Sequence, residues 1–154
     1  MPAWYMDTSA LVKRYVGEVG THWVRRALVR PVRQPIYTSL LAHTEVLSAL
    51  QRKVREGTLP MVDAQRLARR VQRHCARRNW LVAITPARVT QANALVQAHP
   101  LRAYDALHLA CALAVREALQ PYGLPAPLFV TADDALLVAA RALGFAVANP
   151  LQHP

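Results

Sequence analysis

A short apolar run ends at an acid very near the start of the chain, in the stretch Trp4-Tyr5-Met6-Asp7-Thr8-Ser9. Residues 3 to 6 predict a buried strand, and the spacing of apolar side chains over residues 9 to 16 predicts a helix directly after it. A strand that passes into a helix at Asp7 places a carboxylate at the carboxyl end of that strand. In open α/β sheets this edge is where ligands bind. The stretch alone leaves a second interpretation open, in which Asp7 or Thr8 only caps the helix.

The same strand-then-helix alternation continues along the 154 residues. Further strands are expected at 36–38, 80–85, 128–131 and 145–148, and further helices at 20–30, 40–55, 58–79, 86–99, 101–119 and 134–143. Ser39 is the expected N-cap of the helix over 40–55. Alternating elements of this kind favour one α/β domain over residues 1–154, with a mostly parallel sheet of four to five strands and helices on both faces.

Three further acids are candidates for the same site as Asp7. Glu45 falls on the side of its helix that carries Leu41, Ser48 and Ala49, opposite an expected apolar stripe of His43, Leu47, Leu50 and Val54. Asp105 lies in the first turns of a helix that is apolar nearly all round, where a carboxylate needs a partner. Asp133 follows the strand at 128–131, and either it or Asp134 could instead cap the next helix. A solvated Glu45 stays open, and His108 is expected to be a core histidine rather than a ligand.

These four acids, Asp7, Glu45, Asp105 and Asp133, can converge at one edge of a parallel sheet. Two like charges about 6 Å apart repel by about 3 kcal/mol at an effective dielectric near 20. Six such pairs together rival the stability of a whole domain, about 5–15 kcal/mol. The cluster must therefore take up protons or bind a cation. Oxygen ligands favour Mg²⁺ or Mn²⁺, and the absence of metal-spaced Cys and His argues against zinc.

The chain is strongly basic, with 19 basic and 9 acidic residues and a net charge of +10. Nearly all the basic residues are arginines, which fork onto phosphates and stack on bases. A polyanionic partner fits this balance, although an arginine-rich composition can also reflect genome base composition. The arginines of the helix at 58–79 are either a solvated face or a phosphate-contacting surface: Arg66, Arg69, Arg70, Arg73, Arg77 and Arg78.

Cysteine usage and hydropathy set the expected compartment. Cys75 and Cys111 lie in expected helices without ligand spacing, so we expect buried free thiols and a cytoplasmic protein. Asp7 interrupts the only apolar stretch that could serve as a leader peptide, so none is expected. The longest apolar run, near residues 106–115, is far shorter than the roughly 20 residues that span a membrane. We therefore expect no membrane association.

A hard cation beside a basic surface suggests phosphodiester chemistry. At this point the residues resemble a known family. The segments Asp7-Thr8-Ser9-Ala10-Leu11-Val12-Lys13, Glu45, Tyr104-Asp105-Ala106-Leu107-His108-Leu109-Ala110 and Val130-Thr131-Ala132-Asp133 are similar in order and spacing to the PIN (PilT N-terminus) domain, and most of all to VapC-type toxins of toxin–antitoxin pairs.

The resemblance covers essentially the whole chain and carries its own expectations. It implies a three-layer α/β/α fold and a Mg²⁺- or Mn²⁺-dependent endoribonuclease. Asp7, Glu45 and Asp105 are the implied metal-binding acids, and Asp133 the fourth. Ser9 and Thr131 are implied to hydrogen-bond within the acidic cluster. Asp134 matches less well and is interpreted as a helix N-terminal residue, and Arg102 receives no role.

The resemblance also implies partners, namely an RNA substrate, a cognate antitoxin protein and a second copy of the chain. Two other functions stay open at this point. One is a housekeeping PIN nuclease in RNA processing, and the other is a non-catalytic RNA-binding module that keeps the fold. A DNA substrate is also not excluded by the sequence.

Overall fold

The computed structural model describes residues 2–29, 35–77 and 79–153. Over these residues the strands form one five-stranded sheet in the order β3-β2-β1-β4-β5, and every pairing is parallel. The strands are β1 (Trp4–Met6), β2 (Ile36–Ser39), β3 (Asn79–Val82), β4 (Leu128–Val130) and β5 (Val147–Ala148). The prediction of a parallel sheet with up to five strands is confirmed, and the β3 strand is shorter than the expected 80–85.

Seven α-helices connect or flank these strands in the described part of the chain. They are α1 (Thr8–Leu11), α2 (Thr21–Val29), α3 (Ala42–Arg55), α4 (Met61–Arg77), α5 (Pro86–Ala98), α6 (Ala103–Leu119) and α7 (Asp134–Ala142). The helix expected at 9–16 is instead the single α turn of α1 followed by a 3₁₀ turn over Val12–Arg14. Residue 30, the expected end of α2, lies outside the described residues. The α3 helix begins at Ala42 rather than at residue 40, and its N-cap is Leu41 rather than the expected Ser39. The Ser39 hydroxyl instead accepts a hydrogen bond from the Leu41 N–H, just ahead of the helix.

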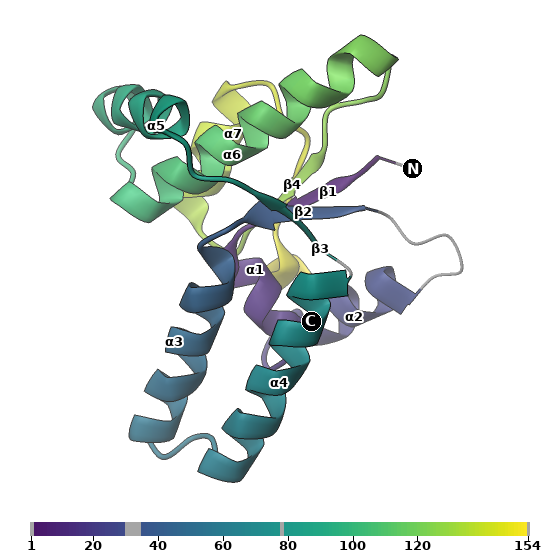
Figure 1. The fold of residues 1–154 in the computed structure, drawn as a ribbon, viewed down its shortest axis with the longest axis vertical. Helices are drawn as coiled ribbons and strands as arrows, with labels where there is room; N and C mark the ends of the chain where they lie inside the picture. Colours follow the sequence, from purple (N-terminus) through teal and green to yellow (C-terminus); the bar gives the residue numbers. More distant parts are fainter. Residues whose placement is uncertain (1, 30–34, 78, 154) are drawn as a thin grey trace.

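Helices cover both faces of the sheet, which gives the expected three layers (Figure 1). Successive side chains of a strand point to opposite faces. Trp4 and Met6 accordingly belong to a core with residues of α1 to α4, whereas Tyr5 belongs to a second core with residues of α5, α6 and α7. The long helix α6 supplies more of the second core than any other element, with buried residues from Ala106 to Val115. Both free thiols, Cys75 and Cys111, are buried, one in each core.

The α3 and α4 helices form an antiparallel hairpin that projects away from the sheet (Figure 1). The expected apolar stripe of α3 is wrong in its register: Ala42, Val46 and Leu50 are the fully buried positions. His43, Leu47 and Val54 are only partly buried. The stripe turns by about one residue because α3 packs against both the sheet core and α4, so the side facing these two surfaces is buried. Glu45 still lies outside that buried face.

None of the helices in the described part of the chain has the length and apolar character needed to cross a lipid bilayer.

Candidate active site

The four acids singled out from the sequence come from four separate segments, and they line one pocket of about 540 Å³. Asp7 follows β1, Glu45 lies on α3, Asp105 on α6, and Asp133 follows β4. The parallel sheet explains the meeting, because adjacent β1 and β4 both end at this edge. The rest of the lining comes from the same elements: Thr8, Ser9, Val12, Leu41, Thr44, Ser48, Ala49, Arg52, Arg102, Tyr104 and His108.

Asp7 is buried at the floor of this pocket, with an exposed fraction of 3%. It caps α1 by accepting the Ala10 N–H on Oδ1 at 3.0 Å. It also accepts the Ser9 hydroxyl at 2.9 Å and, on Oδ2, the Thr131 hydroxyl at 2.9 Å. The cap is therefore one part of its role, since the same carboxylate faces the pocket.

Burial raises the pKa of Asp7, and His108 together with the hydrogen bonds from Ala10, Ser9 and Thr131 offsets only part of that rise. A carboxyl group in this state is costly to ionise unless a positive charge arrives. The site therefore holds one acid that favours either a proton or a nearby cation.

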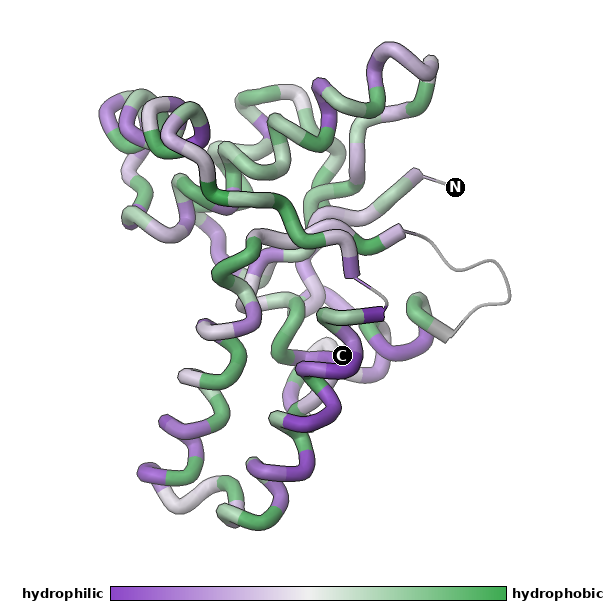
Figure 2. Tube along the Cα trace, in the orientation of Figure 1, coloured by the Kyte–Doolittle hydropathy of each residue, from purple (hydrophilic) through white to green (hydrophobic). Residues whose placement is uncertain are grey.

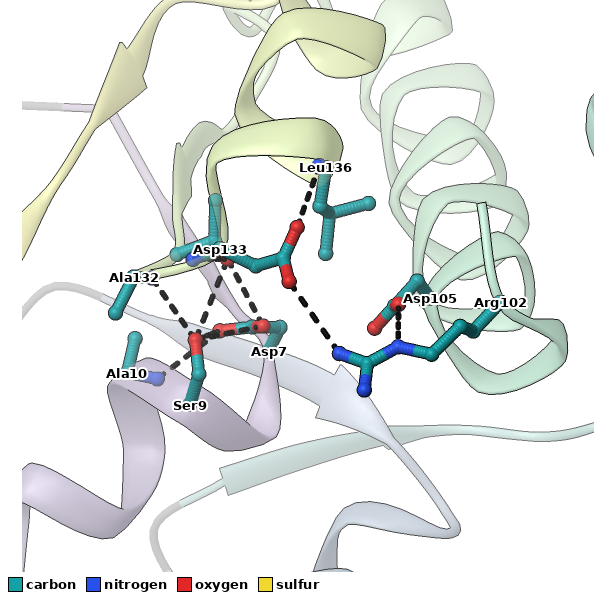
Figure 3. A network of polar contacts seen from close by, with 9 residues as sticks. Asp7, Ser9, Ala10, Arg102, Asp105, Ala132, Asp133 and Leu136 are labelled. Carbon is teal, nitrogen blue, oxygen red and sulfur yellow. Dashed lines mark hydrogen bonds and ion pairs between the residues drawn. The ribbon is translucent and has the colours of Figure 1, made fainter. Parts of the chain in front are cut away.

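Ser9 and Thr131 hold Asp7 in place and are themselves fixed by the backbone. The Ala132 N–H donates to Ser9 Oγ at 2.8 Å, and the Asp133 N–H donates to Thr131 Oγ1 at 3.0 Å. These bonds tie the first turn of α1 to the segment that leaves β4 (Figure 3). The two hydroxyl residues therefore link the segments that follow the adjacent strands β1 and β4 around one carboxylate.

Glu45 is held by two donors on a single oxygen. Its Oε2 accepts the Thr8 hydroxyl at 2.7 Å and lies 2.8 Å from His108 Nε2. Burial works to raise the pKa of Glu45, but the hydrogen bond and charge of His108 and the bond from Thr8 outweigh it and lower that pKa. The pocket thus lowers the pKa of Glu45 and raises that of Asp7, which favours a charged Glu45 beside an Asp7 that is harder to ionise.

His108 is the residue whose importance the sequence analysis missed. It is buried and its ring is satisfied on both sides, because the Tyr5 hydroxyl lies 3.1 Å from Nδ1. In that sense it is the core histidine that was expected. It also lines the pocket and contacts Glu45, and its spacing of three residues from Asp105 was the available signal, since residues i and i+3 share a helix face.

Arg102 joins the two remaining acids, as Figure 3 shows. Its Nε lies 3.1 Å from Asp105 Oδ2, and one terminal nitrogen lies 3.4 Å from Asp133 Oδ2. The other oxygen of Asp133 accepts the Leu136 N–H at 2.8 Å and so caps α7. Asp134 is exposed in the first turn of α7 and does not line the pocket. The Arg102 side chain is itself 82% exposed, so this counter-charge sits at the solvent-exposed rim.

The donor chemistry of the pocket fits a hard cation. The ligands available are carboxylate oxygens, and within the described residues no hydrogen bond reaches Oε1 of Glu45 or Oδ1 of Asp105. The side chains do not form a finished cage: in the part of the chain that the structure describes, no three His, Cys, Asp or Glu residues are grouped closely enough to hold a metal ion. Arg102 supplies the positive charge between Asp105 and Asp133 instead. The assignment of metal ligands remains a prediction.

Comparison with known proteins gives matches that extend over nearly the whole chain. The family model described as "PIN domain" matches residues 4–142. Ribonuclease VapC46 of Mycobacterium tuberculosis is 33% identical over 150 residues, which are 97% of this chain and 99% of that protein.

A solved structure has the same fold. The chain is similar to one from a toxin–antitoxin complex of Klebsiella pneumoniae, with a TM-score of 0.58 and 18% identity over 96% of this chain and 98% of that one. At this identity the likeness supports the fold alone.

Proposed function

The chain belongs to the PIN domain family, and from this premise we propose that it is a metal-dependent endoribonuclease that acts as the toxin of a toxin–antitoxin pair. One observation carries the proposal: four carboxylates from distant segments line a single pocket in a chain whose net charge is +10. A basic protein attracts RNA, while an acidic pocket repels phosphate unless a cation reverses its sign. The ribonuclease name of the relative that is 33% identical agrees with this chemistry.

The proposed reaction is hydrolysis of an RNA phosphodiester bond by water, without a covalent enzyme intermediate. Asp7, Glu45, Asp105 and Asp133 are the residues that would hold Mg²⁺ or Mn²⁺. Such an ion, when bound, lowers the pKa of a water molecule and offsets charge on the phosphate.

Neighbouring residues orient the acids of this pocket and add positive charge to its lining. Ser9 and Thr131 fix the orientation of Asp7 through bonds of 2.9 Å. His108 and Thr8 hold Glu45 in one orientation and favour its charged form. Arg52 on α3 and Arg102 at the start of α6 line the pocket, where guanidinium groups can fork onto phosphate oxygens.

We extend the proposal to the setting of the protein. A cognate antitoxin binds the chain and blocks the activity, and the toxin–antitoxin complex of the structural neighbour agrees with such a partner. All 154 residues act as a single domain, and two copies form a homodimer, which rests on the family resemblance alone. The buried free thiols suit the reducing cytoplasm, where we place the activity.

The first test is cleavage of a mixed RNA pool with Mg²⁺, with Mn²⁺ or with EDTA. We expect metal-dependent cutting that both Asp7→Asn and Asp105→Asn abolish. Asp134→Asn is the matched control, because it removes the same charge from an exposed acid that does not line the pocket. It should cut like the wild type.

Other outcomes would contradict the proposal in distinct ways. Cutting that persists in both pocket variants would point to a contaminating nuclease. RNA binding without cutting by any form would favour a non-catalytic RNA-binding module. A cutting enzyme that does not arrest the growth of its host, and that has no small antitoxin gene beside its own, would be a housekeeping nuclease rather than a toxin.

A further inference from the structure

One face of α4 carries a row of arginines outside the pocket. They are Arg66, Arg69, Arg70, Arg73 and Arg77. All five are exposed, and the next arginine, Arg78, lies outside the described residues. At 3.6 residues per turn these positions fall within about 100° of one another around the helix. They therefore form a continuous stripe, which we call the α4 arginine stripe.

The stripe lies opposite the face that holds α4 in the fold. Ala64, Val71 and Cys75 are the buried positions of this helix, and they lie roughly 100–180° around the axis from the stripe. Packing therefore fixes which way the arginines point. Because the α3–α4 hairpin projects from the body, its outer face is accessible along its length, and Figure 2 shows the hydrophilic residues along α4.

The positive charge of the stripe is largely unneutralised. Among the described residues, Arg66 pairs with Asp63 at 2.8 Å, and its side chain is still 74% exposed. No ion pair with another described side chain involves Arg69, Arg70, Arg73 or Arg77. Exposed like charges at adjacent turns repel one another and cost stability. A chain that places five arginines on one face therefore accepts a cost that a bound polyanion would remove.

The residues between the arginines favour nucleic acid over protein as the occupant. Protein interfaces rely on an apolar core with aromatic side chains. The exposed side of α4 from Arg66 to Arg77 contains instead Gln72 and Ala76 beside the arginines, with no large apolar side chain. The stripe is about 16 Å long at 1.5 Å per residue, which matches roughly five successive phosphates at about 3.4 Å each along one helical strand.

We propose that the α4 arginine stripe binds the phosphate backbone of the RNA substrate at a distance from the cleaved bond. This inference rests on the proposed function and adds a second RNA contact to it. No described residue of α4 lines the pocket, so the two surfaces are separate. The substrate is then an RNA long enough to reach both, and the stripe contributes affinity without sequence preference, since phosphates carry no sequence information.

The test is the salt dependence of RNA binding, measured by fluorescence anisotropy with a labelled single-stranded RNA in EDTA, where no cutting is expected. Each phosphate contact contributes about 0.7 to the slope of log affinity against log salt concentration for a single strand. The double variant Arg69→Gln with Arg73→Gln should bind several-fold more weakly, with a slope smaller in magnitude by about 1.4.

The control is Arg26→Gln with Arg141→Gln, which removes the same charge from two exposed arginines on α2 and α7. It should keep the wild-type slope, and glutamine maintains the helix in every variant. Equal slopes for the two double variants would overturn the proposal. Unchanged RNA binding together with a weakened antitoxin complex would overturn it in favour of an acidic protein partner. Because the measurement needs no cleavage, a failed nuclease assay with a changed slope would remove the enzyme proposal alone.

Discussion

Gly20→Ala is expected to be among the most destabilising single-methyl changes in this chain. Gly20 has φ +85°, and a Cβ there would lie 2.5 Å from the backbone oxygen of Pro150. The left-handed conformation costs an L-residue about 1–2 kcal/mol. The collision adds about 1–3 kcal/mol, because a backbone oxygen cannot swing aside as a flexible side chain can. Alanine returns about 0.4–1 kcal/mol by restricting the unfolded chain.

The net loss in the free energy of unfolding is therefore roughly 2–4 kcal/mol. For a domain of this size that lowers the thermal midpoint by roughly 4–16 °C, measured by circular dichroism or calorimetry. Gly57→Ala is the matched control: Gly57 has φ +71°, but nothing lies within 4 Å of its added Cβ. It should lose only about 1 kcal/mol or less.

The difference between the two glycines measures how firmly the C-terminal turn sits on the start of α2. That turn is the 3₁₀ segment Pro150–Gln152, and His153 beyond it stacks on Trp23 at 4.6 Å between ring centroids. Removing residues 149–154 should make the effect of Gly20→Ala equal to that of Gly57→Ala. Equal losses of unfolding free energy for Gly20→Ala and Gly57→Ala in the full-length chain would refute the reasoning, since they would mean that a Cβ at residue 20 does not collide with Pro150.

Three further predictions concern the pocket. Because burial raises the pKa of Asp7, the wild type loses folding free energy as pH rises from the unfolded pKa, about 4, to the raised folded pKa. The stability of Asp7→Asn relative to the wild type should therefore increase as pH rises above about 4. The pKa of Glu45 is lowered, so its charged form stabilises the fold above about pH 4; Glu45→Gln should therefore lose about 1 kcal/mol at neutral pH, and this loss should disappear as pH falls. Denaturant titrations at several pH values should show that the stability relative to the wild type rises with pH for Asp7→Asn and falls with pH for Glu45→Gln. The same direction for the two variants would contradict both predictions. Arg102→Ala removes the guanidinium between Asp105 and Asp133, so calorimetry should show tighter Mn²⁺ binding than in the wild type or in Arg141→Ala, and unchanged binding would mean that Arg102 does not compete with the ion.

Local sequence patterns were enough to predict the architecture. Short apolar runs predict the strands and helical spacing of apolar residues predicts the helices, which gives an alternating α/β order. That order favours a parallel sheet with helices on both faces. The order also placed Asp7, Glu45, Asp105 and Asp133 at strand exits and helix starts, from which their shared pocket follows. These inferences succeed because each depends on neighbours along the chain and on a topology that leaves few alternatives.

Some local details were not predictable because several residues compete for the same role. Asp133 rather than Asp134 caps α7, since its Oδ1 reaches the Leu136 N–H at 2.8 Å. The stripe of α3 is shifted by one residue because two surfaces, the sheet core and α4, approach the helix together. A period of 3.6 residues defines a face only to within about one position, so packing decides between neighbours.

Only the tertiary structure decided which groups pair with the acids of the pocket. The sequence by itself predicted that four acids can converge, and that their mutual repulsion would then need a proton or a cation to offset it. Which group provides that relief depends on distances between residues far apart in the chain: His108 lies 2.8 Å from Glu45, and Arg102 bridges Asp105 and Asp133. Electrostatic energies vary steeply with separation and burial, which only the folded chain fixes. For the same reason, only the fold explains why the pKa of Asp7 is raised and that of Glu45 is lowered within one pocket.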